Sequence, residues 1–255
     1  MGHGQVIDHM FFDGLEDAYD RGKLMGVFAE LCAKHYKFTR EEQDAFAIES
    51  LKRAQKADFS REIIPVTVKD KKESREILID EQPGKAKLDK IPTLKPAFAP
   101  DGTVTAANAS SISDGAAALV LMRQSEARKR GLEVLVKIIG HESYAKEPAW
   151  FTTAPVGALR ELAGKIGWDF ESIDLFEINE AFAVVTMAAM TELSLPHDKV
   201  NIHGGACALG HPIGASGARI LVTLLAALEK YNLKRGMATL CIGGGEAVAL
   251  AVERP

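Results

Sequence analysis

The second part of the chain alternates short apolar runs with longer segments of helical periodicity, and this alternation restricts the fold more than any other feature. The runs that predict strands are 116–122, 134–139, 175–178, 200–202, 237–242 and 247–252. The segments that predict helices are 125–130, 155–165, 180–193 and 215–231. Strands that alternate with helices and end in a hairpin indicate a layered α/β domain.

The first part of the chain has a different pattern and is expected to be mostly helical. Apolar spacing predicts one helix within 14–36, and Thr39 with Glu42 has the pattern of a capping box that opens a second helix. Two short β-like runs, 63–68 and 77–79, follow on either side of the charged KDKKES. Residues 80–103 are rich in Lys, Pro and Gly, which predicts an extended excursion without a core of its own. The character of the sequence changes near residues 113 and 133.

Composition excludes several classes of function. The chain has 255 residues, of which 47% are hydrophobic and 26% charged, an ordinary balance for a globular protein. Its net charge of -4 gives no reason to expect nucleic acid or an anionic membrane as a partner. The N-terminal segment lacks the pattern of a secretory signal, and the run near 220–228 is too short to span a bilayer. Three cysteines without close pairing argue against a disulfide framework, so we expect a soluble, cytoplasmic protein.

Asn179 lies where a predicted strand ends and a predicted helix begins. Such junctions lie at the carboxyl edge of α/β sheets, where ligands commonly bind. Asn is also a favoured N-cap residue, so Asn179 could serve only to cap the helix. The residues alone leave both interpretations open.

A glycine-rich loop follows at 203–217 and reads HGGACALGHPIGASG. Its glycines allow backbone conformations that other residues avoid, and they let a ligand approach the main chain around His211. His203, Cys207 and His211 are spaced by four, as metal ligands on a helix would be. The glycines and Pro212 make a helix there unfavourable, so we expect no metal site. No Gly-Lys-Ser/Thr follows, so a Walker-type phosphate loop is unsupported. A structural role for His211 stays open.

Cys241 ends a predicted strand and precedes a turn made only of glycine, in LCIGGG. A buried Cys is usually a small hydrophobic residue. Here the glycines leave space beside the sulfur, and their N–H groups could bind an oxyanion. Cys32 lies on an amphipathic helix stripe and Cys207 lies among alanines, so both are expected to serve packing.

Together these motifs resemble the thiolase family. NEAF at 179–182, GGACALGHPIGASG at 204–217 and CIGGG at 241–245 occur in the family's order, and TVTAANASSISDGAAALV at 103–120 adds a fourth match. The resemblance extends over essentially the whole chain. It implies a thiolase-like layered α/β half-domain, with a mixed sheet and helices on both faces, preceded by a mostly helical loop domain.

The resemblance also implies domain limits and an activity. We expect a loop or cap domain over 1–113, a remnant of the N-terminal thiolase half-domain over 114–133, and the C-terminal thiolase half-domain over 134–255. Family members are acyl-CoA acyltransferases that catalyse Claisen condensation of acetyl-CoA or thiolytic cleavage of 3-ketoacyl-CoA. No cofactor is expected beyond the coenzyme A thioester that serves as substrate, and a homo-oligomer is expected.

Site residues follow from the matching motif positions. Cys241 would be the general acid/base, and the site would have to lower the pKa of its thiol to make thiolate available. His211 and Asn179 would form one oxyanion hole, and the N–H of Gly243 would serve a second. The residues expected to line the pantetheine tunnel or the acyl pocket are Ser110, Met25, Phe182 and Phe151. Leu24 stands where the family often has His, and Phe151 stands near a position often occupied by Met.

One family feature is expected to be absent. The nucleophilic Cys of the family lies in an N-terminal half-domain, and Cys32 matches no nucleophile motif. We therefore expect a C-terminal portion that keeps only about 114–132 of the first half and cannot form the acyl-enzyme alone. A separate N-terminal thiolase half could complete it. The alternative is a non-catalytic CoA-binding or structural subunit. A Rossmann-type nucleotide binder lacks its glycine fingerprint. The run 116–122 is expected to leave an exposed sheet edge that favours association.

Overall fold

The computed structural model describes residues 1–69 and 73–255. Its centre is a four-stranded sheet in the order β3–β6–β5–β4. The strands are β3 (Lys137–Ala145), β4 (Leu175–Ile178), β5 (Arg235–Ile242) and β6 (Glu246–Glu253). Strand β6 is antiparallel to both β3 and β5, whereas β4 is parallel to β5. The predicted mixed sheet is confirmed.

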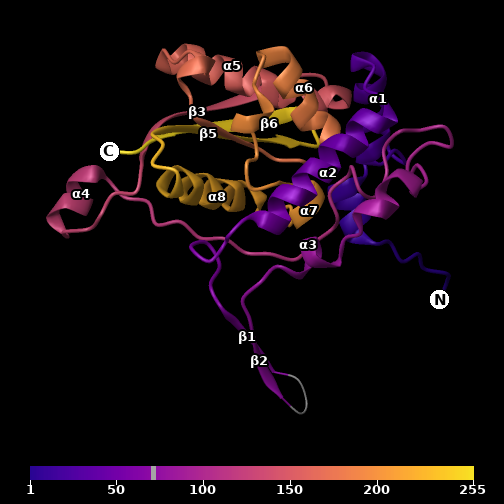
Figure 1. The fold of residues 1–255 in the computed structure, drawn as a ribbon. Helices are drawn as coiled ribbons and strands as arrows, with labels where there is room; N and C mark the ends of the chain where they lie inside the picture. The colour runs from indigo at the N-terminus through magenta and orange to yellow at the C-terminus, as the bar shows by residue number, and fades with distance from the viewer. Residues whose placement is uncertain (70–72) are drawn as a thin grey trace.

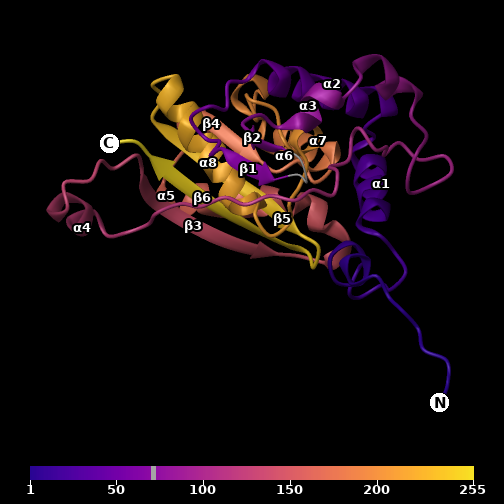
Figure 2. The same ribbon diagram turned by 90° about the horizontal axis from the view of Figure 1, so that it is seen from below.

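Helices cover both faces of this sheet (Figures 1 and 2). Helices α5 (Ala154–Ile166) and α6 (Ala183–Leu193) share one apolar core with Ala247, Ala249 and Ala251 of β6. Helix α8 (Ser216–Lys230) packs on the other face, where Leu224 and Leu228 meet Val252. Alternate residues of a strand point to opposite faces, so one strand supplies both cores. The predicted layered α/β arrangement is confirmed.

The N-terminal region is mostly helical, as predicted, and it packs beside the sheet rather than on it (Figure 1). It holds a π-helical turn η1 (Phe11–Leu15), helix α1 (Met25–Tyr36), helix α2 (Arg40–Lys56), the short helix α3 (Glu81–Lys85) and a 3-10 helix η2 (Leu88–Thr93). The capping box at the start of α2 is confirmed, because the Thr39 hydroxyl accepts from the Glu42 N–H and the Glu42 carboxylate accepts from the Thr39 N–H.

Smaller elements connect these parts. They are α4 (Gln124–Lys129), η3 (Pro148–Thr153), η4 (Phe170–Ser172), η5 (His197–Lys199) and α7 (Ala206–Leu209). An antiparallel hairpin of β1 (Val66–Lys69) and β2 (Ser74–Ile77) projects from the body (Figure 1). The middle of the predicted KDKKES linker, 70–72, lies outside the described residues. No helix in the described ranges is long and apolar enough to cross a membrane.

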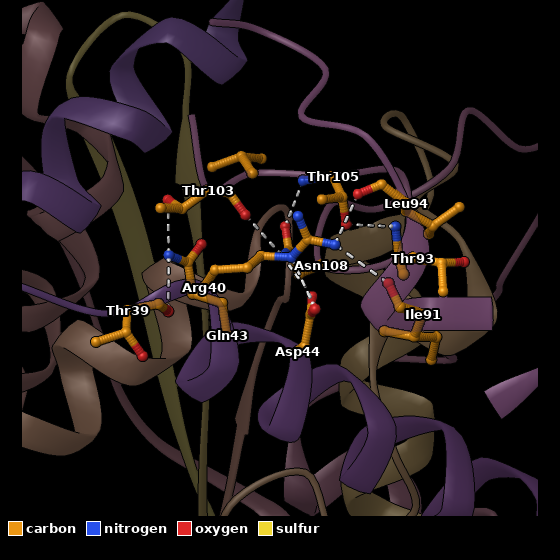
Figure 3. Close-up of polar contacts among 12 residues, drawn as sticks. Thr39, Arg40, Gln43, Asp44, Ile91, Thr93, Leu94, Thr103, Thr105 and Asn108 are labelled. Carbon is orange, nitrogen blue, oxygen red and sulfur yellow. Dashed lines mark hydrogen bonds and ion pairs between the residues drawn. The ribbon is translucent and has the colours of Figure 1, made fainter. Parts of the chain in front are cut away.

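A buried polar network joins α2 to the segment that leads into the site (Figure 3). The Asp44 carboxylate accepts from Arg40 Nε at 2.7 Å and from Asn108 Nδ2 at 3.0 Å. The Asn108 carbonyl accepts from the Ala183 N–H at 2.8 Å, at the start of α6. Because unpaired buried polar groups are costly, this network fixes the segment around Ser110 against both helices.

The predicted buried strand at 116–122 is wrong. These residues form no strand, and Val120 and Leu121 are 88% and 66% exposed. A strand needs a neighbour to accept its backbone hydrogen bonds, and none of the described strands pairs with this run. The segment instead runs past α8 toward α4 (Figures 1 and 2).

Several element limits also differ from expectation. Strand β3 begins three residues after the predicted start and continues to Ala145, because its exposed edge position admits the polar residues that the apolar pattern excluded. The predicted strand at 200–202 is reduced to one bridge between Phe176 and Val200. Residues 80–103 do contribute to a core, since Ile91 packs among Leu51, Ala54 and Ala208. The glycine-rich loop contains the one-turn helix α7, which was not expected.

Candidate active site

His211 is presented by the loop between α7 and α8. Gly210 directly before it has a φ of +84°, and a Cβ there would collide with the Ser113 side chain, so only glycine fits. The His211 N–H donates to the Ser111 carbonyl at 3.0 Å. The ring Nδ1 is in hydrogen-bond contact with the hydroxyl of Ser216, the first residue of α8. The imidazole is therefore held from both the loop and the helix.

Asn179 follows the last residue of β4, and its backbone N–H continues the sheet by donating to the Thr239 carbonyl at 3.0 Å. The N-cap of α6 is Phe182, so the interpretation of Asn179 as a helix cap is wrong. Its side chain is buried, and Nδ2 lies 3.5 Å from Nε2 of His211. The amide and the imidazole thus form a pair at the carboxyl end of β4.

A cavity of about 560 Å³ lies against this pair. Of the eight site residues selected from the sequence, seven line it: Met25, Ser110, Phe151, Phe182, His211, Cys241 and Gly243. Asn179 lies behind His211 and contacts it. A largely apolar cavity with a few convergent polar groups is the usual form of a ligand site.

Three segments form the walls of this cavity. Ser110 is fixed because both its N–H and its hydroxyl donate to the Ala181 carbonyl, at 3.0 and 2.9 Å. The rings of Phe182 and Phe98 meet edge to face at 6.0 Å. Gly243 comes so close to Met25 that an added Cβ would lie 2.9 Å from the Met25 sulfur. The glycine turn therefore brings its main chain to the cavity surface.

Burial sets the protonation of both titratable groups at this cavity. Burial, assisted by the Arg219 cation, lowers the pKa of His211 to about 4, so the imidazole is neutral and can accept a proton. Burial raises the pKa of Cys241 to about 12, so the sulfur carries its proton. The expectation that the site lowers this thiol pKa is wrong, because no cation in the described residues offsets the loss of water around the sulfur.

The other two cysteines do not line the cavity. Cys32 is fully buried in the core between α1 and α6, and burial raises its pKa to about 11. Cys207 lies against the Glu180 carboxylate and main chain, and burial raises its pKa as well. His203 contacts the Tyr231 hydroxyl at 3.2 Å. Across 1–69 and 73–255, no three or more His, Cys, Asp or Glu side chains are grouped to hold a metal ion.

Sequence reasoning missed a group of residues that contact His211, act on it through their charge or pair with such a residue. They are Ser216, Arg219 and Glu177, which belong to α8 and β4. Ser216 belongs to the glycine motif at 204–217 and Arg219 lies two residues after it, so their positions in the first turn of the helix were the available signal. Nothing in the local pattern showed that Glu177 would meet Arg219.

The fold and site together define a layered α/β protein with a half-buried imidazole and a buried thiol at one cavity. A model of the thiolase C-terminal domain matches residues 132–254, and a model of the thiolase N-terminal domain matches residues 1–125. Together they account for nearly all of the chain, which belongs to the thiolase family.

The N-terminal match corrects one expectation. The chain is not a C-terminal portion alone, because its first 125 residues match the N-terminal domain of the family. That match includes the helical region that the sequence pattern had separated from the first half.

Individual relatives agree with this assignment. A probable acetyl-CoA acetyltransferase of Dictyostelium discoideum is 47% identical, over 99% of this chain and 62% of its own length. The cytosolic acetyl-CoA acetyltransferase of Mus musculus is 48% identical, over 100% of this chain and 66% of its own. Among solved structures, the acetyl-CoA acetyltransferase of Bacillus anthracis has a TM-score of 0.95 at 41% identity, and the Acat5 thiolase of Ascaris suum in complex with coenzyme A has 0.87 at 39%. Each alignment covers all of this chain and 66% of the solved one. The chain thus spans slightly under two thirds of the length of these relatives.

Proposed function

We propose that this chain carries the proton-transfer side of a thiolase-type active site, which catalyses Claisen condensation of acetyl-CoA or thiolytic cleavage of 3-ketoacyl-CoA. The observation that carries this proposal is that His211 and Cys241 line one cavity and that Asn179 contacts His211, although the three residues come from separate segments of the chain. The relatives named acetyl-CoA acetyltransferases, and the Ascaris suum neighbour solved with coenzyme A, support it.

Cys241 serves as the general acid/base. In thiolytic cleavage, the bond between the α and β carbons breaks and the electron pair stays on the α carbon of the departing acetyl-CoA. That carbon then takes the proton from the Cys241 thiol. Condensation is the reverse, in which the Cys241 thiolate takes the α-proton. Because the pKa of the Cys241 thiol is raised, the sulfur already carries the proton that thiolytic cleavage requires it to donate.

Two groups of hydrogen-bond donors stabilise the thioester oxygens. His211 and Asn179 form the first oxyanion hole, with Asn179 orienting a water molecule toward the oxygen. The Gly243 N–H forms the second, beside Cys241. A donor of this kind contributes about 3 kcal/mol to lowering the barrier. The close approach of Gly243 to the cavity gives its main chain access to the reacting oxygen.

The cavity walls select the substrate. Ser110, Met25 and Phe182 line the path of pantetheine, and Phe151 lies beside the acyl group. The thioester itself is the only cofactor-like group required. We further propose that the protein works as a homo-oligomer in the cytoplasm, in keeping with the relative named cytosolic.

The acyl-carrying thiol comes from another segment of polypeptide. Among the three cysteines only Cys241 lines the cavity, and it is assigned to proton transfer. We propose that a separate N-terminal thiolase half, or a longer form of this protein, supplies the nucleophile. The same observation favours a second candidate, in which the chain is a non-catalytic CoA-binding or structural subunit.

The test compares two proteins. Cleavage of acetoacetyl-CoA is measured with the 255-residue chain and with an extended form that adds an N-terminal thiolase half, and binding of coenzyme A is measured by calorimetry. We expect both to bind coenzyme A and only the extended form to cleave. Cleavage by the short chain would contradict the need for a second thiol. Binding without cleavage by either form would favour the subunit, and loss of both would reject the site.

A further inference from the structure

A cluster of buried charged and titratable side chains adjoins the segments that carry His211 and Asn179. Glu177 belongs to β4 and precedes Asn179 by two residues, so both side chains point to the same side of the strand. Arg219 belongs to the first turn of α8, three residues after Ser216. Glu62 comes from the segment between α2 and β1. The cluster therefore joins the strand that ends at Asn179, the helix that holds His211 and the helical N-terminal region.

The guanidinium of Arg219 lies beside the carboxyl of Glu177. Its Nη1 lies 3.9 Å from Oε2 of Glu177, whose side chain is 3% exposed. All three guanidinium nitrogens are buried and make no hydrogen bond to the described residues. Oε2 of Glu62 accepts from the Thr223 hydroxyl at 2.7 Å, one helical turn after Arg219, and Oε1 of Glu62 is buried and unpartnered. A buried cation with this little direct bonding is costly, which makes a purely structural role a poor explanation.

The cation acts on both sides of the cluster. Burial raises the pKa of Glu177 to about 8 and so keeps this carboxyl mostly protonated at neutral pH, and it raises the pKa of Glu62 as well. Arg219 opposes both shifts by favouring the charged carboxylates. It also disfavours a second positive charge on His211. Several other charged or titratable side chains lie around His211. Cys241, Asp13 and Glu16 line the same cavity, and Asp114 lines the adjoining one. Arg219 of α8 acts on His211 by its charge, and Glu177 contacts Arg219. Arg219 is the only cation among them in the described part of the chain.

We propose that Arg219 is a positioning residue for the His211–Asn179 pair, which it serves by linking α8 to β4 through its contact with Glu177. Its meaning for catalysis rests on the proposed function. The tie fixes the distance between the two side chains that would share the thioester oxygen. The charge keeps Nε2 of His211 free to accept the proton of an attacking thiol.

Histidine titration by NMR on the 255-residue chain tests this proposal without any turnover. The His211 signal is assigned by its loss in His211→Asn. In Arg219→Met we expect the pKa of His211 to rise from about 4 toward the ordinary value of 6.5. Arg219→Lys, which keeps the charge, should stay near the parent value. Glu62→Gln is the matched control, because it breaks the same cluster but leaves the cation.

The outcomes separate positioning from general stability. A structural role alone would lower the melting temperature of Arg219→Met and Glu62→Gln alike and leave the titration of His211 unchanged, and that result would overturn the proposal. An equal rise in Glu62→Gln would overturn it too. If Arg219→Met does not fold, Arg219→Met/Glu177→Gln removes both partners of the ion pair and should show the same rise.

Turnover by the extended form gives the second readout. We expect Arg219→Met to lower kcat roughly tenfold to a hundredfold, with KM for coenzyme A unchanged, because the pantetheine wall lies elsewhere. A rise in KM with kcat unchanged would contradict positioning. If no form of the protein transfers acyl groups while the His211 titration responds as expected, the proposed function fails and the electrostatic role of Arg219 stands.

Discussion

The two walls of the cavity are built on different principles. The wall that holds Asn179 and His211 is polar and rests on a cluster of buried charges, whereas the wall that holds Cys241, Phe151 and Phe182 is almost entirely apolar. Burial acts on the titratable groups of the two walls in opposite directions: it lowers the pKa of the imidazole and raises the pKa of the thiol. The comparison teaches that one cavity can hold a proton acceptor and a proton donor without an ion pair between them.

The largest effect is expected on the apolar wall. Cys241→Ala in the extended form should lower kcat by about 10² to 10⁴, because it removes the group that moves the α-proton. The matched control is Cys207→Ala, which removes a thiol that does not line the cavity. Steady-state rates for acetoacetyl-CoA cleavage check this. Equal losses in the two variants would mean that the apolar wall supplies packing and no chemistry.

The polar wall should respond next. Asn179→Ala removes one donor from the first oxyanion hole and should lower kcat by about 10² to 10³. Affinity for coenzyme A should be unchanged, since Asn179 lies behind His211 and outside the pantetheine wall. Rate and binding are measured on the same preparation. Weaker binding with an intact rate would place Asn179 in substrate binding.

The pH dependence of stability tests two titratable groups of the polar wall. Folding raises the pKa of Glu177 from 4.5 to about 8. The stability that this group contributes is therefore fully present below pH 4.5 and is lost as the pH rises through 8. Folding lowers the pKa of His211 from 6.5 to about 4. The stability that this group contributes is therefore present above pH 6.5 and is lost as the pH falls through 4. Glu177→Gln should therefore remove a decline in melting temperature between pH 4.5 and 8. An unchanged decline in this variant would show that Glu177 is ionised throughout.

The smallest effect is expected from Phe151→Met on the apolar wall. The ring of Phe151 packs edge to face on Phe28 at 6.4 Å, and Met fills a similar volume with greater flexibility. We expect a loss of stability below about 1.5 kcal/mol. Relative kcat/KM should shift toward longer 3-ketoacyl chains by roughly tenfold at most. Urea denaturation and competition between substrates measure the two effects, and a shift toward shorter chains would remove Phe151 from the acyl pocket.

Predictability from sequence differs between elements for a physical reason. Strand β4, helix α8 and the Thr39 capping box follow from local patterns, because periodicity and caps depend on neighbours within a few residues. The run 116–122 has an equally strong apolar pattern and forms no strand, because a strand also needs a partner elsewhere in space. The site residues were selected by their motifs, whereas Arg219 and Glu177 belong to no motif that indicates their contact.

By itself, the sequence determined the layered α/β class, the family through its three glycine-containing and NEAF motifs, and the residues that gather at the cavity. Only the tertiary structure decided that Phe182 rather than Asn179 caps α6, that Cys241 keeps its proton, and that Arg219 contacts Glu177. The reason is that motifs record which groups are present, while burial and charge act through distance, which only the folded chain sets.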